Sequence, residues 1–176
     1  MLFVGVRQPR KNLPRAIGAF RAAKADRGLV HRLVLVGKRG WRSSETERAI
    51  EEAGEDVQPV GYVADADLPA FYAGAEALLF PSLYEGFGIP ILEAFACGTP
   101  VVASDVSALP EVAGHAAVLV DPRDEDAIAD GLMRTLRDDA LRKDLARRGR
   151  ERLRRFDWTE TARRTVAGYE WAVERG

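Results

Sequence analysis

Two glutamates, Glu85 and Glu93, flank seven residues, GFGIPIL, that carry no charge. Ionised carboxylates accept hydrogen bonds, so both side chains could bind the hydroxyl groups of a ligand. The two glycines between them, Gly86 and Gly88, tolerate positive φ angles and allow a ligand to approach the backbone closely. The segment therefore predicts a turn between two acidic side chains that reach different parts of one ligand.

Pro90 has the fixed φ that is favoured at the first position of a helix, so we expect a helix to begin there. The backbone amides near Gly88 and Ile89 would then lie at the positively polarised end of that helix, where phosphate binds readily. Glu93, about one turn into the helix, would accept from hydroxyls of the molecule that carries the phosphate. Together these features favour an anion at the turn and polyols on either side of it.

A purely structural interpretation of the same residues stays open. The helix dipole alone favours Glu near a helix N-terminus, and glycines occur in ordinary turns. The chain has neither a Gly-x-Gly-x-x-Gly fingerprint after its first apolar run nor a Walker phosphate-binding loop. From these residues alone, a binding site and an ordinary turn before a helix are equally supported.

Six apolar runs, which are rich in β-branched residues, alternate with helix-like stretches. The runs are nearly unbroken, which is typical of strands buried on both faces of a sheet. Strands that alternate with helices indicate an α/β fold, a Rossmann-like doubly wound parallel sheet. Ligands of such sheets bind beyond the C-terminal ends of the strands, where residues 83–90 follow the fourth run. The runs are 2–6, 32–37, 57–63, 77–82, 100–105 and 116–121.

Hydroxyl and acidic residues mark the expected helix starts. Ser44 and Glu47 have the spacing of a capping box. Asp65 is expected to cap the next helix, with Asp67 favoured by the helix dipole. Residues 65–67 also match an Asp-x-Asp metal motif, but capping is the favoured interpretation, and we expect neither a metal nor another cofactor. Residues 124–126, Asp-Glu-Asp, are interpreted in the same way.

The alternation stops after Pro122, so we expect one domain, with residues 1–122 as its β/α core and residues 123–176 as C-terminal helices. The last helix, from Asp157, should place an apolar stripe on one face, and this stripe must pack on another surface. Two interpretations stay open, the core of this domain and a second domain. The stripe consists of Trp158, Ala162, Val166, Tyr169 and Val173.

The composition is that of a globular protein. The chain has 176 residues, 47% of them hydrophobic, and a formal charge of −1 from 26 basic and 27 acidic residues, which excludes a general polyanion binder. The single cysteine, Cys97, excludes an intrachain disulfide, and a packed residue is favoured over a nucleophile. We find no signal peptide and no apolar run of the roughly 18 to 20 residues that a membrane span needs, so we expect a cytoplasmic protein.

Residues 142–155 contain eight basic residues among fourteen. A solvated helix face explains them, and peripheral contact with anionic lipid at the inner face of the membrane is the alternative. Nucleic acid is not expected as a partner, because no aromatic residues for base stacking are interleaved.

Long segments of the chain resemble the C-terminal domain of retaining glycosyltransferases of the GT-B fold, above all the large GT4 family of mannosyl- and glucosyltransferases. The resemblance implies a nucleotide-sugar donor, such as GDP-mannose or UDP-glucose, and transfer of a hexose to a glycan or lipid-linked acceptor. It also implies an N-terminal acceptor domain that this chain lacks. The segments that carry it are 9–20, 33–41, 60–82, 80–114, 118–132 and 156–162.

The resemblance further implies roles for individual residues. Glu93 would accept from the ribose hydroxyls, and Glu85 from hydroxyls of the transferred sugar. Lys11, together with Arg10, would stabilise the negative charge of the departing diphosphate. Two further donor contacts are implied. The backbone near Val63 would contact the base. The turn would contact the sugar and the diphosphate through Gly86, Phe87, Gly88 and Ile89.

One position departs from the family pattern. Many members have an arginine directly after the glycine of the first strand, but here Val6 follows Gly5, and Arg7 and Arg10 lie nearby. The segment "PRKN" favours Arg10. Two other functions stay open: a non-catalytic nucleotide-sugar-binding subunit of a two-chain transferase, and another GT-B enzyme, such as a nucleotide-sugar epimerase or a retaining phosphorylase.

Overall fold

The computed structural model describes residues 1–175, with the side chains of residues 26 and 27 left aside. Six parallel strands form one sheet in the order β3-β2-β1-β4-β5-β6. The chain builds the sheet outward from β1 to β3 and then crosses to the other side of β1, so the winding reverses between β1 and β4. The predicted doubly wound sheet is confirmed. Its strands are β1 (Leu2–Val4), β2 (Leu33–Val36), β3 (Val57–Gly61), β4 (Leu78–Phe80), β5 (Val101–Ser104) and β6 (Ala117–Val120).

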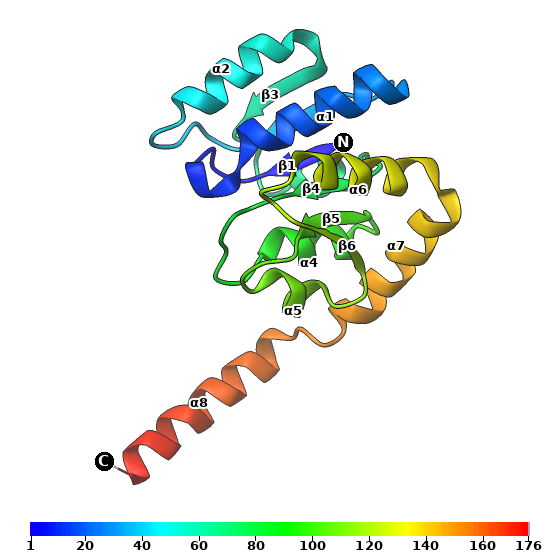
Figure 1. Ribbon diagram of the computed structural model, residues 1–176. Helices are drawn as coiled ribbons and strands as arrows, with labels where there is room; N and C mark the ends of the chain where they lie inside the picture. Colours follow the sequence, from blue (N-terminus) through cyan, green and yellow to red (C-terminus); the bar gives the residue numbers. More distant parts are fainter. Residues whose placement is uncertain (176) are drawn as a thin grey trace.

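Alternate residues of each strand enter two separate hydrophobic cores. In β1, Phe3 belongs to one core, and Leu2 and Val4 belong to the other. Because both faces are covered, the strands are largely apolar, and of the six described strands only β3, at one side of the sheet, has exposed residues, Gln58 and Pro59. Helices α1, α2 and α6 cover the Phe3 face, and α3, α4 and α5 cover the opposite face (Figure 1). Their bounds are α1 (Leu13–Arg27), α2 (Ser44–Ala53), α3 (Leu68–Ala73), α4 (Ile89–Ala96), α5 (Leu109–Ala113) and α6 (Glu125–Arg137), and short 3₁₀ turns occupy η1 (Pro9–Lys11) and η2 (Gly54–Asp56).

The capping box predicted at α2 is wrong. The helix already begins at Ser44, and Ser43 at the N-cap makes no side-chain capping hydrogen bond. Glu47 instead accepts a hydrogen bond from Arg7 Nε over 3.1 Å. The side chain of Glu47, which the local spacing predicted to cap α2, therefore forms a tertiary ion pair with Arg7 instead.

The predicted cap at Asp65 is also wrong. A turn closed by a hydrogen bond from Asp67 N to Ala64 O, 2.9 Å long, occupies this segment. Helix α3 begins only at Leu68, with Asp67 at the N-cap and no side-chain capping bond. The interpretation of residues 124–126 is confirmed, because Asp124 Oδ1 accepts from the backbone N–H of Ala127 at the start of α6.

Helix α7 (Asp139–Leu153) packs against α4 and α6. A Cβ added at Gly149 would lie 2.6 Å from the ring of Phe95, so only glycine permits this close approach. Arg152 donates hydrogen bonds to the backbone carbonyls of Val112 and Glu111 at α5. Part of the basic run at 142–155 therefore serves packing within the chain, and contact of the run with lipid stays an untested alternative.

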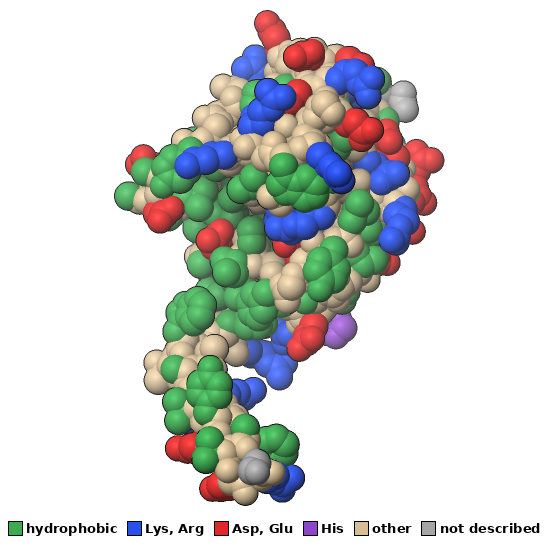
Figure 2. All heavy atoms as spheres, turned by 90° about the vertical axis from the view of Figure 1, so that its left-hand side faces the viewer, with side chains coloured by type: hydrophobic (Ala, Val, Ile, Leu, Met, Phe, Trp, Pro, Cys, Tyr) green, Lys and Arg blue, Asp and Glu red, His purple; other side chains and the backbone are tan. Residues whose placement is uncertain are grey.

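Helix α8 (Trp158–Glu174) projects away from the sheet and its covering helices (Figure 1). None of its described residues is buried, and the predicted stripe is solvent-exposed, with Trp158 82% and Tyr169 70% accessible. Hydrophobic side chains gather along this helix in Figure 2. The prediction that the stripe completes the core of this domain is thus wrong. No helix within residues 1–175 is long and apolar enough to cross a membrane.

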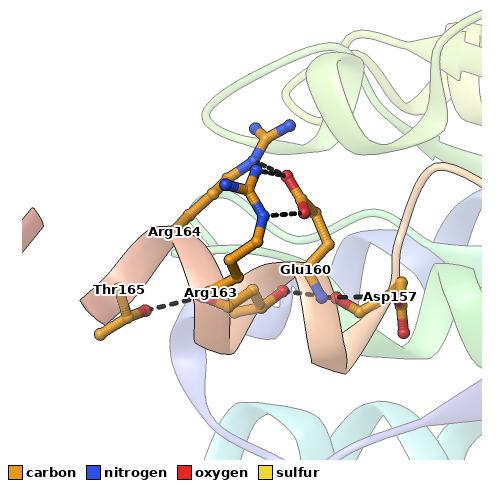
Figure 3. A network of polar contacts seen from close by, with 6 residues as sticks. Asp157, Glu160, Arg163, Arg164 and Thr165 are labelled. Atoms are coloured by element: carbon orange, nitrogen blue, oxygen red, sulfur yellow. Dashed lines mark hydrogen bonds and ion pairs between the residues drawn. The ribbon is translucent and has the colours of Figure 1, made fainter. Parts of the chain in front are cut away.

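Local interactions stabilise the first turns of this projecting helix (Figure 3). Asp157 caps it by accepting from the backbone amides of Thr159 and Glu160. Glu160 then pairs with Arg163 and Arg164, and these hydrogen bonds and charges lower its pKa to about 2. Such i,i+3 and i,i+4 pairs and caps support a helix that has no tertiary packing.

Candidate functional site

The loops that follow β1 and β4 meet at the point where the winding of the sheet reverses. The backbone N–H of Leu83 donates to the carbonyl of Arg10 over 2.7 Å. Asn12, which has a left-handed φ of 59°, donates through its side-chain amide to the carbonyls of Pro81 and Pro122. These bonds hold η1 against the loop after β4, at the edge where doubly wound sheets bind ligands.

At this junction the structure brings three predicted residues into one cluster. Lys11 Nζ lies 2.5 Å from Glu85 Oε1, and Arg10 lies 2.6 Å from Glu85 Oε2. Lys11 and Glu85 are buried, whereas the Arg10 side chain is 44% exposed. We call Arg10, Lys11 and Glu85 the charge cluster. Two cations share one carboxylate, so the cluster carries one net positive charge.

The surroundings shift the pKa values of both buried members of the cluster. Burial lowers the pKa of Lys11, while the hydrogen bond and charge of Glu85 act in the opposite direction. Burial alone would raise the pKa of Glu85, but the hydrogen bond and charge of Lys11, together with Arg10, hold that pKa below its ordinary value. The carboxylate of Glu85 stays ionised because both neighbouring cations stabilise its negatively charged form.

Two further contacts position the cluster. Gly5 has φ +149°, and a Cβ added there would lie 3.2 Å from Lys11 Cε, so the glycine leaves room for the lysine stem. The backbone N–H of Glu85 donates to Ser107 Oγ over 3.1 Å, which links the loop after β4 to the loop after β5. Ser107 itself adopts a left-handed φ of 56°.

One of the two glycines in the turn between the glutamates adopts a positive φ. Gly88 has φ +106°, and a Cβ added to it would lie 2.7 Å from a Leu109 side-chain carbon. Gly86 does not adopt a positive φ, so only the second glycine uses the conformational freedom that both residues offer. Helix α4 begins at Ile89, so Pro90 is its second residue rather than its first.

The start of α4 offers free donors. Among residues 1–175, the backbone amides of Phe87, Gly88 and Ile89 donate no hydrogen bond. The side chains of Phe87 and Ile89 are exposed, and Phe87 contacts the ring of Phe156 edge-on at a centroid distance of 5.8 Å. Unpaired N–H groups at a helix start can bind an anion.

Glu93 lies in the second turn of α4 and is half-buried. Its Oε2 accepts a hydrogen bond of 2.6 Å from the hydroxyl of Tyr72, which comes from α3. Glu93 therefore stands on the helix that begins at the turn, while Glu85 pairs with η1 before the turn. Sequence patterns did not single out Tyr72, Asn12 or Ser107, because each acts through a contact distant in sequence.

The other predicted residues are less closely tied to this junction. Val63 follows β3, is half-buried and packs against the core on the α4 side of the sheet. Arg7 donates a hydrogen bond to Glu47 on α2, whereas Arg10 contacts Glu85 directly. The geometry thus supports Arg10 as the arginine of the site.

Cys97 is partly buried, and burial raises the pKa of its thiol, which suits a packed residue better than a nucleophile. Within the part of the chain that the structure describes, no group of three His, Cys, Asp or Glu side chains is arranged to hold a metal ion.

Comparisons with known proteins agree on one family. The model described as "Glycosyl transferases group 1" matches residues 1–152. The chain is 38% identical over 171 residues to O-antigen chain mannosyltransferase B of Escherichia coli, a match that covers 96% of this chain and 45% of that protein. It is 43% identical over 136 residues to the MMP alpha-(1->4)-mannosyltransferase of Mycolicibacterium hassiacum, covering 74% of this chain and 33% of that protein.

Solved structures share the same architecture. Sucrose-phosphate synthase from Thermosynechococcus elongatus superposes with a TM-score of 0.84 at 31% identity, over 99% of this chain and 45% of that one. Anabaena HepE in complex with UDP superposes with a TM-score of 0.80 at 23% identity, over 97% of this chain and 48% of that one. The chain therefore spans less than half the length of each of these relatives.

Proposed function

Because the chain belongs to the glycosyl transferases group 1 family, we propose that it is the donor-binding domain of a retaining glycosyltransferase that moves a hexose from a nucleotide sugar to a glycan or lipid-linked acceptor. The mannosyltransferase names of the similar proteins support mannose as the hexose, with glucose as the alternative. The resemblance of the site segments to GT4 enzymes supports the retaining mechanism.

The observation that carries this proposal is the charge cluster beside the unpaired amides of α4. The donor diphosphate would lie between Lys11 and the amides of Gly88 and Ile89. Its negative charge would compete with Glu85 for Lys11, and the Glu85 carboxylate would turn to hydroxyls of the sugar. Glu93 would accept from the ribose hydroxyls, and the backbone near Val63 would contact the base.

In the transfer step, the acceptor hydroxyl oxygen bonds to the anomeric carbon on the face from which the diphosphate leaves. The bond between that carbon and the phosphate oxygen breaks, and its electron pair stays with the diphosphate, which also takes the acceptor proton. Lys11 and Arg10 stabilise the charge that develops on the diphosphate. Glu85 orients the sugar and offsets the positive charge that develops on its ring. These side chains supply the required charge without a metal ion.

The acceptor would be held by an additional domain. The relatives are more than twice as long as this chain, and the exposed stripe of α8 offers a surface on which a second domain could pack. We therefore expect residues 1–176 alone to bind the donor weakly and to transfer little sugar. Full-rate transfer by the purified chain to a defined acceptor would contradict this expectation.

A nucleotide-sugar epimerase would be expected to have a histidine at its catalytic site, and neither histidine of this chain lies at the charge cluster. His31 precedes β2 and lies 3.0 Å from Glu76, which precedes β4, so the pair stands at the opposite edge of the sheet from the charge cluster. His115 precedes β6 and lies toward the same opposite edge. A non-catalytic donor-binding subunit stays the second candidate, and an acceptor domain encoded in the same polypeptide would count against it.

Donor titration tests the proposal directly. We would follow backbone amide resonances while GDP, UDP, GDP-mannose and UDP-glucose are added separately. Saturable shifts at Gly88 and Ile89 are expected for the nucleotides of one base. Lys11→Ala should weaken that binding, and Lys143→Ala, an exposed lysine of α7, provides the matched control. Equal affinity in both variants would refute the role of the charge cluster.

A further inference from the structure

Tyr72 connects α3 to the glutamate on α4. It is 1% exposed, and its hydroxyl donates to Glu93 Oε2 over 2.6 Å. At its other end, the Tyr72 carbonyl accepts from Thr99 Oγ1 over 2.7 Å and from the N–H of Ala75 over 3.0 Å. The ring between these two ends lies in the core beneath α4, together with Phe95. The hydroxyl is therefore held at a defined place beside the carboxylate.

We propose that Tyr72 is a positioning residue that orients the Glu93 carboxylate toward the ribose hydroxyls of a nucleoside diphosphate. The inference rests on the proposed function and extends it to a residue that does not itself contact the donor. The inference follows from the position of a buried phenol that is held at both ends. Among the described side chains, Tyr72 is the one that donates a hydrogen bond to Glu93.

The chemistry of the pair suits this role. Burial, followed by the hydrogen bond and charge of Glu93, raises the pKa of Tyr72, so the phenol stays neutral and acts as a donor. Its bond occupies one position on Oε2, and the carboxylate keeps acceptor positions on Oε1 for the two hydroxyls of a ribose. A glutamate without this donor would sample several rotamers and would lose that freedom when it binds a ligand.

The test replaces Tyr72 by Phe, which keeps the ring in the core and removes only the donor. Dissociation constants for GDP and UDP would be measured by calorimetry, each beside its 2′,3′-dideoxy analogue, which lacks the ribose hydroxyls. We expect Tyr72→Phe to weaken the ribonucleotide by about tenfold, the usual effect of losing a hydrogen bond to a charged group. Affinity for the dideoxy analogue should stay unchanged. Tyr169→Phe, on the exposed face of α8, is the matched control.

The dideoxy comparison separates positioning from general structural damage. If Tyr72→Phe weakens both nucleotides equally, or weakens neither, the positioning role is overturned. Glu93→Gln tests the underlying assignment, because it should reduce the preference of the parent protein for the ribonucleotide. A parent protein that shows no such preference, or binds neither nucleotide, would overturn the ribose role of Glu93 and the inference with it. Thermal unfolding of each variant confirms that the compared proteins are folded.

Discussion

Lys11 Nζ lies 2.5 Å from Glu85 Oε1, so two residues that are assigned to different parts of the donor neutralise each other directly. They are 74 positions apart in sequence, and the meeting of η1 with the loop after β4 brings them together. The exposed Arg10 shares the same carboxylate. Under the proposed function, the donor diphosphate would replace Glu85 as the partner of Lys11, which would free the carboxylate for the sugar and couple the two contacts.

Removing one member of this pair should destabilise the domain. Lys11→Met leaves the buried Glu85 with Arg10 alone, and we expect the free energy of unfolding to fall by about 1–3 kcal/mol. The double variant Lys11→Met/Glu85→Gln should lose less than the two single variants together, because neither buried charge is then left unpaired. Urea unfolding measures both effects, with Lys143→Met as the surface control. Strict additivity would show that the pair is not coupled.

The pair also predicts a pH dependence at acidic pH. Although burial acts against it, hydrogen bonding with Lys11 holds the pKa of Glu85 below its ordinary value of 4.5. A carboxyl group with a lowered pKa in the folded state adds stability above its unfolded pKa and loses it as the pH falls through the folded pKa. The difference in unfolding free energy between the parent and Glu85→Gln should thus be largest near pH 7 and shrink below pH 4.5. A constant difference from pH 7 to pH 3 would contradict this.

The two glycines of the turn should respond differently to a methyl group. Gly88→Ala places a Cβ at φ +106° and within 2.7 Å of Leu109, so we expect a loss of roughly 1–3 kcal/mol in unfolding free energy. Gly86→Ala is the matched control, because a Cβ there meets nothing within 4 Å. Thermal unfolding compares the variants. Equal effects at both positions would show that the backbone of Gly88 is not constrained.

Helix α8 should contribute little to the stability of the rest of the chain. A protein truncated after Phe156 keeps the contact of that ring with Phe87 and loses only residues without buried side chains. Its free energy of unfolding should stay within about 0.5 kcal/mol of the parent value. Ultracentrifugation should also show less self-association, because the exposed apolar stripe is gone. A large loss of stability would mean that α8 packs on the domain.

Local patterns were sufficient where the physics is local or repetitive. Unbroken apolar runs that alternate with helices predict a parallel sheet with two covered faces, and all six strands occur where the runs lie. The caps at Asp124 and Asp157 follow from residue type and position, because the bonds they make are only two or three residues away. The resemblance of long segments to GT4 enzymes predicted the family that the comparisons show.

Local patterns gave wrong predictions where the outcome depends on contacts between residues that are far apart in sequence. Glu47 has the spacing of a capping residue, but it pairs with Arg7, which lies 40 positions away. The stripe of α8 has the periodicity of a core helix, yet periodicity does not specify which surface will cover it, and this domain does not. In both cases the deciding contact depends on how separate elements are placed.

Residue types and order alone thus determined the doubly wound sheet, the glycine-containing turn at the end of its fourth strand and the acidic residues on each side of that turn. Only the tertiary structure decided which cations form ion pairs with Glu85, which tyrosine donates a hydrogen bond to Glu93 and which glycine adopts the positive φ. Strand and helix patterns arise from neighbours a few positions apart. Ion pairs and hydrogen bonds across the winding reversal depend instead on the relative positions of loops that the chain brings together only when the sheet is complete.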